Sequence, residues 1–202
     1  MMLRLLLANV FLIGACLATP AAAQLRGIPL SVEIHAGALV PLGGWEVRGR
    51  ETALQVGVGP LFSGALRLTL PAGFSVYSAY HRALPRCEEC DLFGLSDQLV
   101  DSGLGLGIGY ALPALLPVPL RLDVGGIAHQ LAFRGGGQNR ASELGFGGEA
   151  GLISSFEIRP SFFAEPAISG RAYTARYEFE EGISREVAVR YVVPRIGLRY
   201  SF

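Results

Sequence analysis

Residues 102–120, SGLGLGIGYALPALLPVPL, decide how this chain folds. The stretch lies between Asp101 and Arg121 and contains no charged residue, so on length alone it could cross a bilayer as a helix of ~20 residues. Glycine, however, occupies every second position from 103 to 109, which disfavours a helix and puts all the bulky side chains on one face of a strand. Three prolines in the second half exclude a continuous helix there. The stretch therefore predicts a strand, a turn over 112–118 and the beginning of another strand.

The same two-residue period recurs along the chain. In the last eleven residues, Leu198 and Phe202 fall on one face with other apolar residues, whereas Arg195 and Arg199 fall on the opposite face. Eleven residues match the ~9–11 that a tilted strand needs to cross a membrane. Similar alternation predicts eight strands, at residues 31–40, 64–70, 74–81, 102–111, 120–126, 144–152, 161–171 and 192–202.

The connections between these segments alternate between short and long. The short ones are 71–73, 112–118 and 154–160, and the long ones are 43–58, 82–101, 133–143 and 174–187. Bacterial outer-membrane barrels have this asymmetry, with short periplasmic turns and longer extracellular loops. Trp45 belongs to the first long connection or its rim, where an aromatic anchor at the membrane interface is common.

The composition favours a barrel in a membrane over a soluble one. Half of the 202 residues are hydrophobic and 17% are charged, against about 25% in soluble domains. The less apolar face of the predicted strands carries mostly Gly, Ala and Ser, which suits a narrow lumen better than a solvated surface. In lipid every backbone group must pair internally, so the sheet must close, and eight strands leave an interior that side chains just fill. The 17 basic and 17 acidic residues balance, so no nucleic-acid partner is expected.

Nine charged residues are assigned to the lumen. They are Glu33, Asp123, Glu149 and Glu165, with Arg67, Arg121, Arg171, Arg195 and Arg199, and the histidines His35, His81 and His129 come in addition. A buried charge needs a partner, so the near-balance of signs predicts a packed ionic network, whereas a selective pore would show one sign in excess. The two arginines of the last strand are expected to lie within reach of Glu33 and Glu165. The substitution Arg195→Ala would then leave a buried carboxylate without its partner.

Residues 1–23 have the layout of a secretory signal peptide, so we expect the barrel domain to span 24–202. Arg4 supplies a positive charge, an apolar run follows, and three alanines before Gln24 form the cleavage site. An alternative is a lipoprotein processing site around Cys16, which would leave that cysteine lipidated.

Cys87 and Cys90 lie in the motif RCEEC. Export places them in an oxidising compartment, where a C-x-x-C pair can close a small loop disulfide. A metal site would need further Cys or His residues nearby, and a redox motif would need a thioredoxin-like βαβ context, so a structural disulfide is the prediction.

The chain resembles the small eight-stranded outer-membrane β-barrels of the OmpA-transmembrane and OmpX-like group. The features that carry the resemblance are the signal peptide, the eight alternating segments, the asymmetric connections and the terminal sequence Arg199-Tyr200-Ser201-Phe202. The resemblance covers essentially residues 28–202. It implies an all-β, eight-stranded antiparallel up-and-down transmembrane β-barrel in the bacterial outer membrane, with both termini in the periplasm. It also implies insertion by barrel-assembly machinery that reads Tyr200 and Phe202. The peptidoglycan-binding domain of two-domain members is not expected, because this sequence stops at Phe202.

The first functional hypothesis is a non-enzymatic barrel, monomeric and in contact with outer-membrane lipids, without cofactor or metal. It would display extracellular loops and contribute to envelope integrity or surface interaction. An alternative is a passage for small apolar molecules, as in family members with a lateral opening. Pro41, Pro166 and Pro194 lie within strand segments, where each removes a ladder hydrogen bond.

A third hypothesis is a lipid-modifying enzyme of the outer leaflet. His81 and His129 are expected near the outer rim with Asp101 between them, and Ser102 follows, which sketches an acyl-transfer set. Two features disfavour it. The strands that carry the two histidines are ~10 Å apart at the usual spacing, and alternation turns Ser102 outward while Asp101 turns inward.

Overall fold

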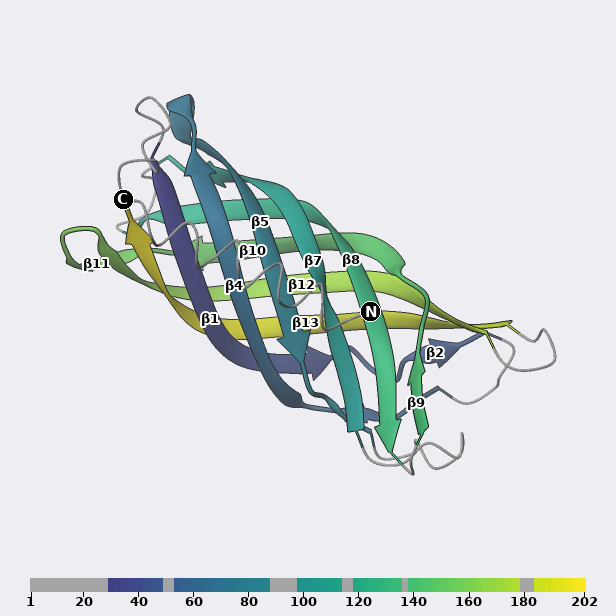
Figure 1. Ribbon diagram of the computed structural model, residues 1–202. Coiled ribbons are helices and arrows are strands. Elements are labelled where there is room, and N and C mark those ends of the chain that lie inside the picture. The colour runs from purple at the N-terminus through teal and green to yellow at the C-terminus, as the bar shows by residue number, and fades with distance from the viewer. Residues whose placement is uncertain (1–28, 49–52, 88–97, 114–117, 136–137, 179–183) are drawn as a thin grey trace.

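The structure is a computed structural model that describes residues 29–48, 53–87, 98–113, 118–135, 138–178 and 184–202. In these segments, eight antiparallel strands close into a barrel (Figure 1). In ring order they are β1 (Leu30–Pro41), β4 (Gly59–Thr69), β5 (Phe74–Ala83), β7 (Gln98–Ala111), β8 (Leu120–Gly135), β10 (Gly145–Ser154), β12 (Phe162–Glu178) and β13 (Ser184–Ser201). Because β13 pairs with β1, the ring has no free edge there. The predicted fold class is confirmed. The predicted signal peptide lies outside the described residues.

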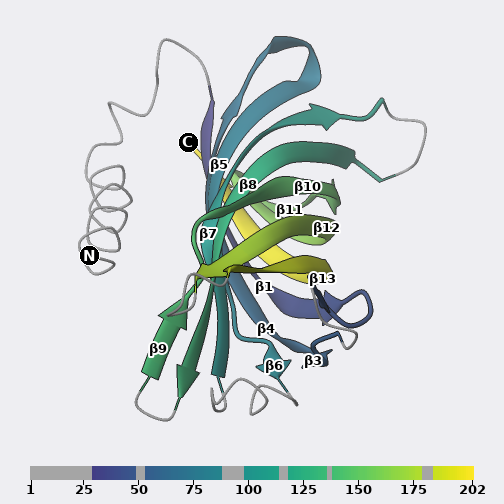
Figure 2. The same cartoon turned by 90° about the vertical axis from the view of Figure 1, so that its right-hand side faces the viewer.

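The two ends of the barrel differ. At the end where Phe202 lies, here called the turn end, short connections join the strands; they include η1 (Pro71–Gly73) and β11 (Phe156–Arg159). The opposite end, here called the loop end, carries the longer connections with β2 (Glu46–Val47), β3 (Val56–Gly57), β6 (Arg86–Cys87) and β9 (Gln138–Ala141). Figure 2 shows β3, β6 and β9 gathered at the end away from the C-terminus.

The strands extend further toward the loop end than the sequence predicted. β12 has 17 residues and β13 has 18, although about 9–11 are enough to cross a membrane. Within the segment 174–187, predicted as a loop, residues 174–178 and 184–187 are therefore strand. Beyond the membrane a strand keeps its inward apolar residues, such as Tyr177 and Val187, but carries polar residues such as Arg176 outward. Because the outward residues are polar, this segment lacks the apolar outward face that predicts a lipid-facing strand, and the sequence therefore predicts a loop there.

The outward face of the barrel is apolar between the two ends. Exposed side chains there include Ile34, Phe62, Leu106, Ile108, Phe146, Ile168 and Ile196. Aromatic residues border this surface at the turn end, where the ring centroids of Phe74 and Tyr110 are 4.9 Å apart and those of Phe162 and Tyr200 are 4.8 Å apart. A contiguous apolar surface with an aromatic girdle is typical of a face in contact with lipid. The described residues include no helix that is long and apolar enough to cross a membrane.

The alternating glycines of β7 face the lumen, and large polar side chains lie over them. A Cβ atom on Gly107 would lie 2.6 Å from the ring of Tyr77, and one on Gly109 would lie 2.7 Å from Nη1 of Arg67. Both separations are far below van der Waals contact, so even alanine would displace the side chain above it. The first part of the uncharged stretch, residues 102–111, is thus a strand whose bulky side chains face outward and whose bare backbone lines the lumen.

The interior divides into an apolar half at the loop end and a charged half toward the turn end. The apolar half, here called the loop-end cluster, contains Leu39, Trp45, Val47, Leu54, Leu61, Leu99, Leu131, Phe133, Tyr177, Val187 and Val189. Trp45 is 1% exposed, and its Nε1 donates a hydrogen bond to the carbonyl oxygen of Arg190 at 3.3 Å. The expectation that Trp45 anchors the barrel at the membrane interface is wrong, because β2 pairs with β13 beyond the end of β1 and the Trp45 side chain lies inside the loop-end cluster.

Cys87 ends β6, packs against the loop-end cluster and is disulfide-bonded. Cys90 lies outside the described residues, so its pairing with Cys87 stays a prediction. Non-reducing mass spectrometry of protein taken from its native membrane should find Cys87 and Cys90 joined within one peptide. Two free thiols, or a metal ion bound in stoichiometric amount, would contradict this prediction.

Candidate functional site in the barrel interior

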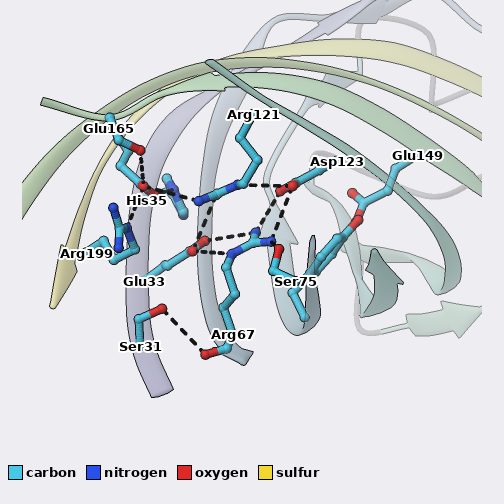
Figure 3. A network of polar contacts seen from close by, with 12 residues as sticks. Ser31, Glu33, His35, Arg67, Ser75, Arg121, Asp123, Glu149, Glu165 and Arg199 are labelled. Carbon is cyan, nitrogen blue, oxygen red and sulfur yellow. Dashed lines mark hydrogen bonds and ion pairs between the residues drawn. The ribbon is translucent and has the colours of Figure 1, made fainter. Parts of the chain in front are cut away.

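Arg67 of β4 lies at the centre of the charged half (Figure 3). Its Nε donates to Oε1 of Glu33 on the neighbouring β1 at 2.6 Å, and its Nη2 donates to Oδ2 of Asp123 on β8 at 2.7 Å. Its Nη1 also donates to the hydroxyl of Ser75 at 2.8 Å. All four side chains are buried. The planar guanidinium can serve two carboxylates at once, so Arg67 joins one wall of the lumen to the other.

Arg121 of β8 extends this network toward the turn end. Its guanidinium lies 3.1 Å from Asp123, 3.3 Å from Glu33 and 3.4 Å from Glu165 of β12. Arg199 of β13 donates to the same Glu165 at 2.7 Å. Together with Arg67, three arginines face three carboxylates, so the charges cancel within the cluster.

Arg171 of β12 forms a second group in the middle of the lumen. Its Nε donates to Glu149 at 3.0 Å, and its Nη2 lies 2.9 Å from Nδ1 of His81. The hydroxyl of Tyr77 donates to the other oxygen of Glu149 at 2.9 Å. These contacts link β5, β10 and β12 across the lumen.

Arg195 of β13 differs from the sequence-based expectation. No carboxylate of the described residues makes an ion pair with it, and its Nε has no hydrogen-bond partner. The register explains this, because Arg195 lies level with Gly37 of β1, whereas Glu165 is already held by Arg199 and Arg121. The substitution Arg195→Ala therefore leaves no carboxylate without its partner, and the large loss of stability expected from the sequence does not apply.

Asp101 and His129 form a hydrogen-bonded pair beneath the loop-end cluster. Oδ1 of Asp101 and Nδ1 of His129 are 2.8 Å apart, and the hydroxyl of Tyr191 donates to Oδ2 at 2.7 Å. The ring centroids of His81 and His129 are only 5.9 Å apart. The sequence-based objection that their strands are too far apart is wrong, because β7 between them presents glycines inward and lets the two rings converge.

This arrangement does not support acyl transfer. Asp101 and His129 are each 1% exposed, so the pair is out of reach of a lipid substrate. Ser102 lies on the opposite face of β7, as alternation predicted, and so cannot act as the nucleophile of this pair. Instead, His129 supplies a hydrogen-bond partner to the buried carboxylate of Asp101.

Three residues of the lumen could in principle hold a metal ion. Ligand atoms of Glu33, His35 and Glu165 lie within 4.8 Å of one another, the one such group in the described part of the chain. The guanidinium groups of three arginines already contact these two carboxylates. A divalent cation would add charge beside them at a high Coulomb cost, so the residues present do not fit a resident metal.

A small cavity lies in the middle of the lumen, with a volume of about 20 Å³. Residues on its wall include His35, Ser63, His81, Glu149, Ser169 and Arg195. This volume holds roughly one or two water molecules, which is too little for a solute to pass.

The strand prolines do not open the wall of the barrel. Pairing between β1 and β13 skips Ala38 and Leu39, opposite Pro194, which has no N–H to donate. The side chains of Leu39 and Val193 are nevertheless 0% exposed, so packing closes the seam where the hydrogen bonds are missing.

Outside the apolar surface, a charged cluster stiffens the hairpin of β12 and β13 at the loop end. Arg176 and Arg48 contact opposite oxygens of Glu186 at 2.6 Å and 3.0 Å. The hydrogen bond from Arg176, followed by the one from Arg48, holds the pKa of Glu186 below its ordinary value. The two arginine side chains are largely exposed, so the cluster contributes little to global stability.

No protein-family model and no curated protein matches the chain. Several solved structures match it. Neisserial surface protein A is 13% identical with a TM-score of 0.59, covering 86% of this chain and 97% of that one. The outer-membrane protein AlkL in DMPC bilayers is 13% identical with a TM-score of 0.60, covering 88% and 90%. OprG from Pseudomonas aeruginosa is 11% identical with a TM-score of 0.57, covering 87% and 96%. This chain therefore has the fold of the small eight-stranded outer-membrane β-barrels.

Proposed function

We propose that this protein is a non-enzymatic β-barrel of the bacterial outer membrane that displays its loop end outside the cell and contributes to envelope integrity or surface interaction. One observation carries the proposal: side chains fill both halves of the lumen, the loop-end cluster in one and the ionic network in the other. The apolar outward face supports the membrane location. Neisserial surface protein A and the outer-membrane proteins AlkL and OprG share the fold, which supports the choice of membrane.

A filled lumen predicts that the folded protein carries no steady ion current. Arg67 closes the charged half with Glu33 and Asp123, and Trp45 closes the apolar half, so hydrated ions have no continuous path. The measurement is planar-bilayer recording of the refolded wild type, with empty bilayers as the baseline and a known open porin as the positive control. A steady wild-type current whose ion selectivity changes in Arg195→Ala would identify a channel instead.

The direction of the barrel in the membrane gives a second test. We expect the loop end to face the outside, because long connections are extracellular in such barrels. The variants Arg48→Cys at the loop end and Glu157→Cys at the turn end each add one cysteine at the position of an exposed side chain. A membrane-impermeant maleimide should label Arg48→Cys in intact cells and Glu157→Cys only after lysis. The reverse pattern would contradict the proposed display of the loop end.

The length of the β12–β13 hairpin supports surface display. Its pairing continues to Glu178 and Ser184, beyond the apolar outward surface, and Glu186 with its two arginines stiffens it. A stiff polar hairpin loses little conformational freedom when a partner binds, which favours a role in surface interaction.

A further inference from the structure

The cavity in the middle of the lumen has an unusual wall. Four strands that are neighbours in the ring, β12, β13, β1 and β4, each contribute one polar atom with no hydrogen-bond partner to it. These atoms are Oγ of Ser169, Nε of Arg195, Nε2 of His35 and Oγ of Ser63, of which Nε2 of His35 also lies 3.8 Å from Oε2 of Glu165. Buried polar groups in proteins are almost always paired, so four orphans around one small space indicate a shared partner.

Arg195 determines the charge that this partner carries. It is the lumen arginine for which no carboxylate of the described residues forms an ion pair. The carboxylates that also line the cavity are occupied: Glu33 and Asp123 by Arg67 and Arg121, and Glu149 by Arg171 and Tyr77. Arg195 is half-buried, but its Nε is buried, and a charge held there without a counter-charge is costly, so the site favours an anion and opposes a metal cation.

The size of the cavity restricts the anion to a single atom. A volume of about 20 Å³ admits roughly one or two water-sized spheres. A tetrahedral oxyanion or a carboxylate-bearing substrate is too large. The hydroxyls of Ser63 and Ser169 can each donate one hydrogen bond, as can the Nε–H of Arg195, and these donors suit a monatomic anion.

We propose that the middle of the lumen binds one halide ion, chloride under ordinary conditions, between Arg195, Ser63 and Ser169. The ion takes the place of the carboxylate that Arg195 lacks. It makes the stability of the barrel depend on which anion is in solution, because a ligand that binds only the folded state stabilises it by mass action.

The first test compares sodium chloride with sodium gluconate at equal concentration, so that general screening is the same in both. Gluconate is too large for the cavity. In chloride at ten times its Kd, the Tm of the detergent-folded wild type should be higher by roughly 3–6 °C. The variants Arg195→Gln and Ser169→Ala should lose this difference. The control Arg190→Gln, an exposed arginine on the same strand, should keep it.

The second test locates the ion and does not depend on the variants folding. Crystals of the wild type grown in sodium bromide should show an anomalous peak within hydrogen-bonding distance of Nε of Arg195. An ordered water at that position without anomalous signal would overturn the proposal, and so would equal Tm values in chloride and gluconate. A chloride effect of the same size in wild type and Ser169→Ala would place the ion elsewhere and would also overturn it.

Discussion

Replacing Arg67 with methionine is expected to lower the free energy of unfolding by about 3–5 kcal/mol. The substitution keeps much of the side-chain volume but leaves Glu33 and Asp123 buried without the guanidinium that now lies 2.6 Å and 2.7 Å from them. The measurement is urea unfolding in lipid vesicles. It can be followed by the fluorescence of Trp45, the single tryptophan of the chain.

The matched control is Arg176→Met. Arg176 also contacts a carboxylate at 2.6 Å, but its side chain is 54% exposed, so water replaces the lost contact and we expect little change. A further variant separates the ion pair from packing. In Arg67→Met combined with Asp123→Asn, two arginines, Arg121 and Arg199, face two carboxylates, those of Glu33 and Glu165, so the charges balance again and much of the lost stability should return. Equal losses for Arg67→Met and Arg176→Met would show that the lumen is open to water.

Truncating Trp45 to alanine is expected to cost about 3–5 kcal/mol, the range for removing a large buried aromatic side chain. The side chain fills the barrel mouth among Leu39, Leu61 and other members of the loop-end cluster. Its loss leaves a cavity that rigid strand backbones cannot close. Because the variant contains no tryptophan, circular dichroism or the mobility of unboiled samples on gels serves as the readout.

The control for Trp45→Ala is Phe146→Ala. Phe146 is 72% exposed on the outward face of β10, where lipid or detergent fills the space that the ring vacates, so the loss should be small. Trp45→Phe should fall between wild type and Trp45→Ala, because it keeps most of the apolar volume and gives up the hydrogen bond to the carbonyl of Arg190. If Trp45→Ala lost as little stability as Phe146→Ala, the loop-end cluster would not be the packed apolar half of the lumen that the structure shows.

The face on which each residue lies could be predicted from the sequence, because the pleat of a strand fixes a period of two. For that reason alone, the four alternating glycines from 103 to 109 face the lumen, and Leu104, Leu106 and Ile108 between them face outward. The same rule placed Arg67 and Glu33 in the lumen, and the structure brings them together.

The height of each residue along the barrel axis could not be predicted, because it depends on the stagger between strands. Glu33 lies level with Arg199 in the β1–β13 register, but it binds Arg67 and Arg121, while Arg199 binds Glu165. Alternation carries no information on this choice. The position of Trp45 was missed for a related reason, since a loop that folds over a barrel mouth is placed by long-range packing and not by local periodicity.

The sharing of charges across the lumen has a consequence for how the barrel enters the membrane. Glu33 is held by one arginine from the next strand and another from the far wall, and Glu165 is held by one arginine from the next strand, β13, and another from β8, two strands away. A half-built sheet of β1, β4, β5 and β7 would therefore carry the Glu33–Arg67 pair before Arg121 and Asp123 of β8 had arrived to complete its contacts. Water must stay in contact with the growing sheet until the last hairpin docks, and only then can the interior dry. We therefore expect the ring to close before its charged interior leaves water.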